Sequence, residues 1–108
     1  MKQTFLIKHA VGGRSFIDSS KHDIKYEVSS QGEGWLFTID VPHSDIVEEI
    51  LALKDELNVF MFQEYEDKPT LKTWYYVENG SVRYDKEQGR LTIAASSCIE
   101  YYPHEYST

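Results

Sequence analysis

The sequence predicts an α+β fold, a mostly antiparallel sheet of about six or seven strands packed against one amphipathic helix over residues 44–57. Short segments rich in β-branched and aromatic residues recur along the chain between turn signals, whereas a helical repeat of apolar residues occurs once. The 108 residues match the commonest domain size, and an apolar content of 41% suffices for one core. We therefore expect residues 1–108 to form a single domain.

Three strands are predicted within the first forty residues. Thr4–His9 is apolar and β-prone, and the glycines at 12–13 end it. His22–Val28 alternates apolar and charged residues, which is typical of a half-buried antiparallel strand. Trp35–Val41 follows a glycine-rich turn at 32–34 and places its largest apolar side chains on one face. These strands should pack one face against the core.

The single helix is predicted over residues 44–57. Ser44 or Asp45 can cap its start, and Asp45 with Glu48 has the spacing of a capping box. Asn58 suits the left-handed residue that often follows a helix. The apolar positions that repeat at helical intervals are Ile46, Val47, Ile50, Leu51, Leu53 and Leu57.

The second half of the chain is predicted to be strands again. Val59–Glu66 begins with apolar residues on both faces, which indicates a central strand. Three further strands are expected at Leu71–Val77, Val82–Asp85 and Leu91–Ala95, joined by hairpin turns at Asn79-Gly80 and Glu87-Gln88-Gly89. The segment from Glu100 to Tyr106 is too aromatic for a solvated terminus and is expected to pack against the fold.

Composition restricts the cellular setting. Cys98 is the single cysteine, so no internal disulfide can form, which favours a cytoplasmic location. The sequence has neither the apolar stretch of a signal peptide nor the ~20 apolar residues of a membrane span, so no membrane association is expected. The net charge of −7 argues against binding nucleic acid. The aromatic strands around Trp35 and Trp74 are expected to form core and cross-strand pairs, since no basic groove accompanies them.

No motif for catalysis, metal or cofactor binding is present. His43-Ser44-Asp45 cannot form a catalytic triad, because adjacent side chains cannot contact one another in the required order, and it is better explained as a helix start. Cys98 has no cationic neighbours in sequence that would activate it. The four histidines lack zinc-site spacing. The segment 12–15 lacks the spacing of a phosphate-binding loop, so its glycines should instead allow a turn at positive φ. A non-enzymatic protein without cofactor is predicted.

The net charge is concentrated in the middle of the chain. The segment from residue 45 to 67 carries a charge of −7, and the remainder is balanced. The predicted helix places its acids opposite its apolar side without basic residues at i+4, and Asp55 and Glu56 would oppose the dipole in the last turn. Helix stability therefore did not select Asp55 and Glu56. The candidate partner-binding residues are Asp45, Glu48, Glu49, Asp55, Glu56, Glu64, Glu66 and Asp67.

Concentrated negative charge favours a basic partner, because it accelerates encounter with positive surfaces. We therefore expect an acidic binding or inhibitor protein that occludes a basic protein, such as an immunity protein that neutralises a nuclease-type toxin. A solubilising acidic surface explains the same charges. Two other functions stay open: a subunit of a phage or surface assembly that self-associates through sheet edges and its aromatic tail, and a small ligand-binding domain or enzyme with a pocket lined by Trp, Tyr and His. The sequence predicts no particular oligomeric state.

Overall fold

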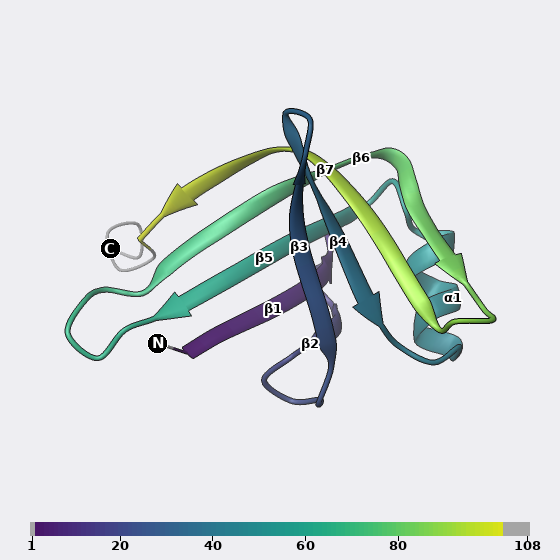
Figure 1. The fold of residues 1–108 in the computed structure, drawn as a ribbon, viewed down its shortest axis with the longest axis horizontal. Helices are drawn as coiled ribbons and strands as arrows, with labels where there is room; N and C mark the ends of the chain where they lie inside the picture. Colours follow the sequence, from purple (N-terminus) through teal and green to yellow (C-terminus); the bar gives the residue numbers. More distant parts are fainter. Residues whose placement is uncertain (1, 103–108) are drawn as a thin grey trace.

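The computed structural model describes residues 2–102, and the side chains of all of these except residues 31 and 78–80. Seven strands form one antiparallel sheet in the order β2-β1-β5-β6-β7-β4-β3, and one short helix covers its end (Figure 1). The elements are β1 (Lys2–His9), β2 (Ser15–Asp18), β3 (Lys25–Gln31), β4 (Gly34–Asp40), α1 (Asp45–Ala52), β5 (Leu57–Glu64), β6 (Leu71–Asp85) and β7 (Arg90–Tyr101). The predicted antiparallel sheet with one helix is confirmed.

The sheet curls into a half-barrel, so that its two ends face each other across the core. β6 and β7 are the long strands that run through the curl, with β1 and β5 on one side and β3 and β4 on the other (Figure 1). The ring of Phe5 on β1 stacks on Tyr26 of β3, with centroids 4.7 Å apart, and on Phe37 of β4 at 5.6 Å. The inner face of the sheet is therefore closed on itself.

Period-two alternation explains which side chains fill the core. On β4 and β5 every second residue points inward, so the predicted apolar faces of these strands are buried. The fully buried residues are Phe5, Ile7, Phe37, Ile39, Val47, Ile50, Val59, Leu91 and Ile93. Each such side chain contributes about 1.5–3 kcal/mol relative to an exposed position. The helix adds Val47 and Ile50 to this core.

The helix is shorter than the predicted range 44–57. α1 ends at Ala52, and Leu53 already leaves helical geometry at φ −110° and ψ 25°. Asp55 and Glu56 therefore lie in the turn after the helix, and the expected conflict with its dipole does not arise. Ser44 occupies the N-cap position, but no side-chain hydrogen bond caps the helix, so the predicted capping box does not form.

The pattern that extended the predicted helix belongs to a strand. Leu57 pairs with His9 and is buried together with Val59 and Met61, so its burial follows a period of two. Asn58 lies within β5 opposite Tyr76, and the described non-glycine residues all have negative φ, so the predicted left-handed cap at Asn58 is wrong. A helical and a strand period overlapped in the sequence at Leu57.

The expected hairpin at Asn79-Gly80 is also wrong. β6 runs through these residues, and the parts predicted as two strands both pair with β7. The pairing shifts from Val77 opposite Ala95 to Val82 opposite Ile93, so the intervening residues form an irregularity within one strand. β7 is correspondingly longer than predicted, reaching Tyr101, whereas residues 103–106 of the aromatic tail lie outside the described part.

β2 was missed by the sequence pattern because it is only four residues long. A register shift near Ile7 lets neighbouring Phe16 and Ile17 both be buried, which removes the alternation. The loop before it contains Gly12 and Gly13 at φ values of 88° and 72°, as expected for a turn between two strands.

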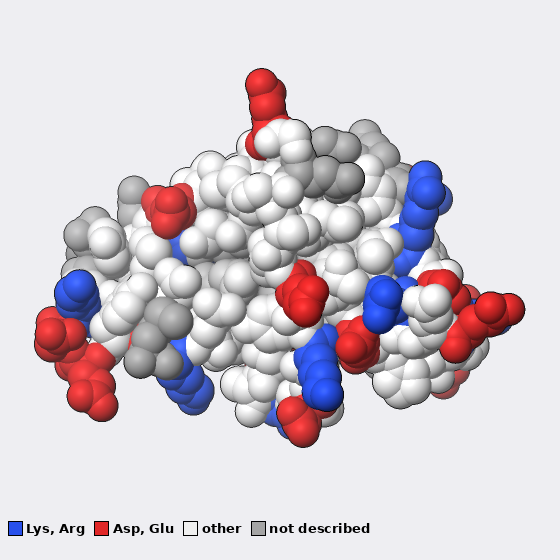
Figure 2. Space-filling view, viewed as in Figure 1, with Lys and Arg blue, Asp and Glu red and all other residues white. Residues whose placement is uncertain are grey.

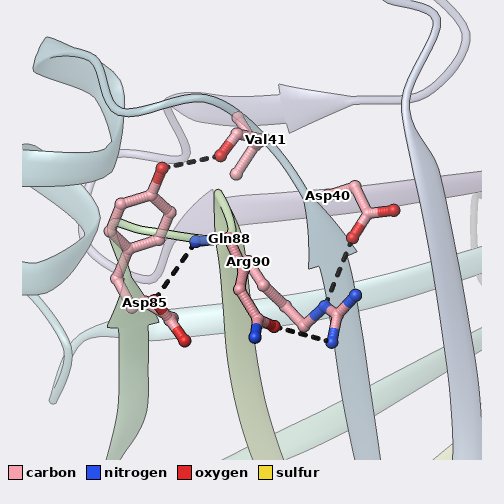
Figure 3. A network of polar contacts seen from close by, with 6 residues as sticks. Asp40, Val41, Asp85, Gln88 and Arg90 are labelled. Carbon is pink, nitrogen blue, oxygen red and sulfur yellow. Dashed lines mark hydrogen bonds and ion pairs between the residues drawn. The ribbon is translucent and has the colours of Figure 1, made fainter.

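The predicted turn at Glu87-Gln88-Gly89 is confirmed and is held by polar contacts (Figure 3). The backbone N–H of Gln88 donates to Asp85 Oδ1 at 3.2 Å. The Tyr84 hydroxyl donates to the Val41 carbonyl at 2.7 Å. Val41 N–H in turn donates to the Gly89 carbonyl at 2.8 Å. These bonds fix the chain between β4 and α1 against the β6–β7 turn, and so set the position of the helix.

No helix within residues 2–102 combines the length and the apolar character needed to cross a membrane.

Candidate binding surfaces

The helix orients one group of the predicted binding residues outward. Val47 and Ile50 are fully buried, which fixes the rotation of α1 about its axis. Asp45 and Glu48 in the first turn are exposed, as are Asp55 and Glu56 after the helix, and Glu49 is half-buried. We call Asp45, Glu48, Glu49, Asp55 and Glu56 the acidic end. In Figure 2 acidic side chains gather over α1 at one end of the long axis.

Partners outside the helix compensate part of this charge. Arg14 Nη1, in the loop before β2, lies 2.8 Å from Glu49 Oε2, an oxygen that is shielded from solvent and accepts no hydrogen bond among the described residues. His43 Nε2 lies 2.5 Å from Glu48 Oε1, and His9 Nε2 lies 3.3 Å from Glu56 Oε1. The helix supplies no basic residue in its last turn, but neighbouring segments do supply partners.

The Glu48 carboxylate stays ionised at lower pH than an ordinary glutamate. The hydrogen bond from His43 holds the pKa of the Glu48 carboxyl below its ordinary value, with smaller help from the charges of His43 and Lys86. The carboxylate is about half exposed, so it can still meet a partner. Glu48 is therefore the best-placed anionic group of the acidic end.

The other three predicted residues lie elsewhere. Glu64 ends β5, and Glu66 and Asp67 follow it in the connection to β6. β5 begins beside α1 and has eight residues, which at about 3.3 Å per residue separates its ends by roughly 23 Å. Figure 2 shows acidic side chains over the β5–β6 connection, at the end of the molecule opposite α1. The acids form two separate groups and not one face.

A second surface lies on the outside of the sheet and contains none of the predicted binding residues. Alternate residues of β5 and β6 point away from the core and place Phe60 opposite Trp74 across the strands. The Trp74 ring lies 5.9 Å from Phe60 and 4.8 Å from Tyr76, and its indole N–H donates to Asn58 Oδ1 at 3.1 Å. We call this surface the aromatic face; its residues are Phe60, Phe62, Lys72, Trp74, Tyr76 and Ile99.

Lys72 lies among the rings of the aromatic face. Its Nζ is 4.4 Å from the centroid of Phe60, 5.2 Å from Phe62 and 5.4 Å from Tyr101. A cation over an aromatic ring at such distances is attracted by the ring quadrupole. Tyr76 and Ile99 are 37% and 45% exposed, respectively. The face is therefore ordered by its own contacts while still presenting apolar surface to solvent.

The signal for this face was present in the sequence. Phe60 and Phe62 on one strand, and Trp74 and Tyr76 on another, alternate with residues that fill the core. Apolar residues on both faces were taken to indicate a central strand, which is confirmed for β5 between β1 and β6. The sequence pattern could not show that the outer side of these strands has no second layer over it among residues 2–102.

The groups considered for catalysis do not assemble. Ser44 is the N-cap of α1, and His43 contacts Glu48, so these neighbours do not form a relay. Burial and then the Glu100 carboxylate raise the pKa of the Cys98 thiol, which opposes its activation as a nucleophile. Within the described residues, no group of three or more His, Cys, Asp or Glu side chains could hold a metal ion.

Comparisons with protein-family models, with curated proteins and with solved structures find no match to this chain.

Proposed function

We propose that this protein is a non-enzymatic binding protein whose acidic end docks on a basic protein, and that it acts in the cytoplasm as an inhibitor of the nuclease-toxin type. The observation that carries the proposal is the fixed outward orientation of Asp45 and Glu48 by a helix anchored through Val47 and Ile50. Acids held on a rigid element lose little freedom on binding, which favours affinity.

The electrostatics of the acidic end suit such a partner. Arg14 offsets the charge of Glu49. Asp45 and Glu48 remain exposed in the first turn of α1, and Glu48 also contacts His43. With a net charge of −7 for the whole chain, approach of a basic surface is favoured over long range, and the rate of association should fall steeply with salt. Binding through these residues would also select against acidic competitors.

A pair of matched charge reversals tests the proposal. Asp45→Lys with Glu48→Lys changes the acidic end by four charges, and Glu64→Lys with Glu66→Lys makes the same change at the opposite end of β5. Both pairs are exposed and leave the Arg14–Glu49 ion pair intact. Each protein is immobilised and used to capture proteins from a lysate of the source cells at low and high salt.

We expect wild type and the Glu64/Glu66 variant to retain the same basic protein and the Asp45/Glu48 variant to lose it. The purified captured protein should then bind at least tenfold more weakly to the Asp45/Glu48 variant. Equal loss in both variants would assign binding to net charge alone, and equal retention would leave the acidic end as a solvated surface; either result contradicts the proposal.

A further inference from the structure

Within residues 2–102, the C-terminal part of β7 is paired on one side only. Arg90–Ala95 lies between β6 and β4, because β4 pairs with these residues from Asp40 opposite Arg90 to Trp35 opposite Ala95. Beyond that point Ser97–Glu100 pairs with β6 alone among residues 2–102. A strand paired on one side presents backbone N–H and C=O groups on the other, which can accept a further strand.

β4 begins at Gly34, directly after the turn from β3, so it has no residue that could pair with β7 beyond Ala95. Gly34 begins β4, and a Cβ at this residue would lie 2.3 Å from the Ala95 carbonyl oxygen, so the two backbones approach as closely as only glycine allows. In the next step of the ladder Tyr76 pairs with Ser97 and Val77 with Ala95, which leaves Ser96 as an extra residue. This bulge bends β7 away from β4 and frees its edge.

β2 and β3, the two outermost strands in the order of the sheet, carry features that prevent strand addition. β2 is four residues long and paired through a register shift. β3 has Lys25 and Glu27 on its exposed positions. Charges, shortness and bulges of this kind protect natural edge strands. Ser97–Glu100 contains one charged residue, Glu100, and no Lys, Arg or Pro, and Ile99 is 45% exposed beside Trp74 of the aromatic face.

We propose that this edge binds a second copy of the same chain, with the two β7 strands antiparallel about a twofold axis at Ile99. The two sheets then join into one, and the aromatic faces of both copies become continuous. A twofold axis normal to the sheet requires facing residues to lie on the same side, so the axis must pass through a residue. Of the free edge, only Cys98, Ile99 and Glu100 have unpaired strand neighbours on both sides among residues 2–102.

Charge and apolar contact select among these three registers. An axis at Glu100 would place two carboxylates opposite each other, which is destabilising. An axis at Cys98 would leave each Ile99 facing a serine. An axis at Ile99 buries the two half-exposed isoleucines against each other and places Cys98 opposite the partner's Glu100, with no like charges paired. The acidic end over α1 lies at the opposite end of the molecule from this contact, whereas Glu64, Glu66 and Asp67 in the β5–β6 connection lie at the same end as the contact (Figure 2).

Site-directed disulfide formation tests the contact and its register. In the full chain with Cys98→Ser, the further change Ile99→Cys puts two thiols directly opposite each other, within the Cα separation of about 4.4–6.8 Å that a disulfide spans. Ser97→Cys in the same background places the thiols out of register. Ser29→Cys gives an exposed thiol on β3 as a control for random collision.

Under mild oxidation we expect the Ile99→Cys protein to form covalent dimers at least tenfold faster than the other two. Sedimentation of unmodified wild type should show a concentration-dependent dimer, and Ile99→Lys should weaken it at least tenfold while Ser29→Lys leaves it unchanged. Wild type that stays monomeric at all concentrations overturns the proposal. So does a full chain that is monomeric while a chain ending at Tyr102 dimerises, since the chain's own tail would then occupy the edge.

Discussion

The outer surface of the curled sheet differs between its two halves, although β6 and β7 contribute to both. Over β5 and the first part of β6 it is aromatic, with Phe60, Trp74 and Tyr76 in mutual contact. Over β4 and the first part of β7 it is polar: Thr92 lies opposite Thr38 and Arg83, and the Arg90 Nε lies 3.5 Å from Asp40 (Figure 3). The change occurs where β6 and β7 shift register, near Val77.

Burial in the core does not explain the aromatic residues on the outer surface, Phe60, Trp74 and Tyr76. Both halves supply buried side chains to the core, and Thr38, Thr92 and Arg83 lie on the outer side of the polar half. An exposed apolar cluster on only one half is the usual mark of an interaction surface. The bulge at Ser96 therefore separates two halves of the sheet. One half has a polar outer face, and the other has an aromatic outer face and an edge without a partner strand among residues 2–102.

The largest expected effect tests whether the halves share one core. Phe37 contacts Phe5 from β1 and Tyr75 from β6, so Phe37→Ala should lower the free energy of unfolding by about 3–5 kcal/mol. Thr38→Ala, on the outer side of the same strand, should change it by less than about 0.5 kcal/mol. Urea unfolding measures both.

The two tryptophans sharpen this test, because Trp35 reports the inner face of β4 and Trp74 the aromatic face. Trp74→Phe and Trp35→Phe each leave one fluorescent reporter. The two transitions should coincide if the halves unfold together, and separate midpoints would show that the halves are independent.

A smaller effect is expected at the boundary between the halves. Gly34→Ala brings a Cβ against the Ala95 carbonyl oxygen, so the backbones must separate, at a cost of about 1–3 kcal/mol. Gly32→Ala in the β3–β4 turn meets no atom within 4 Å and tests the cost of positive φ alone. Thermal unfolding of both should show the lower midpoint for Gly34→Ala; the reverse order would contradict the close approach.

The regions that the sequence predicted are those with one clear period. Alternation identified β3 and β4, and a central β5, while the turn at Gly32-Glu33 followed from its glycines. The end of α1 was predicted wrongly because Leu57 fits both the helical period and the strand period of apolar residues. The sequence identified the acidic residues but did not predict that they form two separate groups, because a local pattern does not show where the end of β5 lies in the fold. The exposed edge of β7 depends on pairing between residues distant in sequence, which no local pattern records.

Lys72 should contribute less to the free energy of unfolding than Phe37 in the core or Gly34 at the boundary between the halves. Its Nζ lies over two phenylalanine rings, and loss of a cation–π contact at an exposed site costs about 0.5–1 kcal/mol. Lys72→Gln should lower stability by this amount in urea unfolding at low and at high salt. Lys25→Gln on the polar half is the matched control, and an equal loss there would show that the rings are not involved.

The smallest expected effect is a pH dependence of stability at low pH, which Asp18 and Glu48 should contribute independently. Hydrogen bonds from Ser20 hold the pKa of Asp18 on β2 below its ordinary value, and the bond from His43 does the same for Glu48. A lowered pKa in the folded state stabilises the protein above the unfolded pKa, so this contribution is lost as pH falls below about 4.3 for Glu and about 3.9 for Asp.

Ser20→Ala should therefore raise the pKa of Asp18 alone, and His43→Ala that of Glu48 alone, in carboxyl NMR titrations. A shift of both carboxyls by either substitution would mean that the two sites are coupled through the fold.

The order of strands in the sheet also constrains the time course of folding. The hairpin of β3 and β4 joins the sheet only through β7, so residues 25–40 must wait for residues 90–95 before they can dock. During synthesis at about 5–20 residues per second, this hairpin has no partner strand for several seconds. Its inner apolar side chains, Phe37 and Ile39, are then exposed in the nascent chain. Production of the intact protein should therefore depend on chaperones that protect such a segment until β7 has been made.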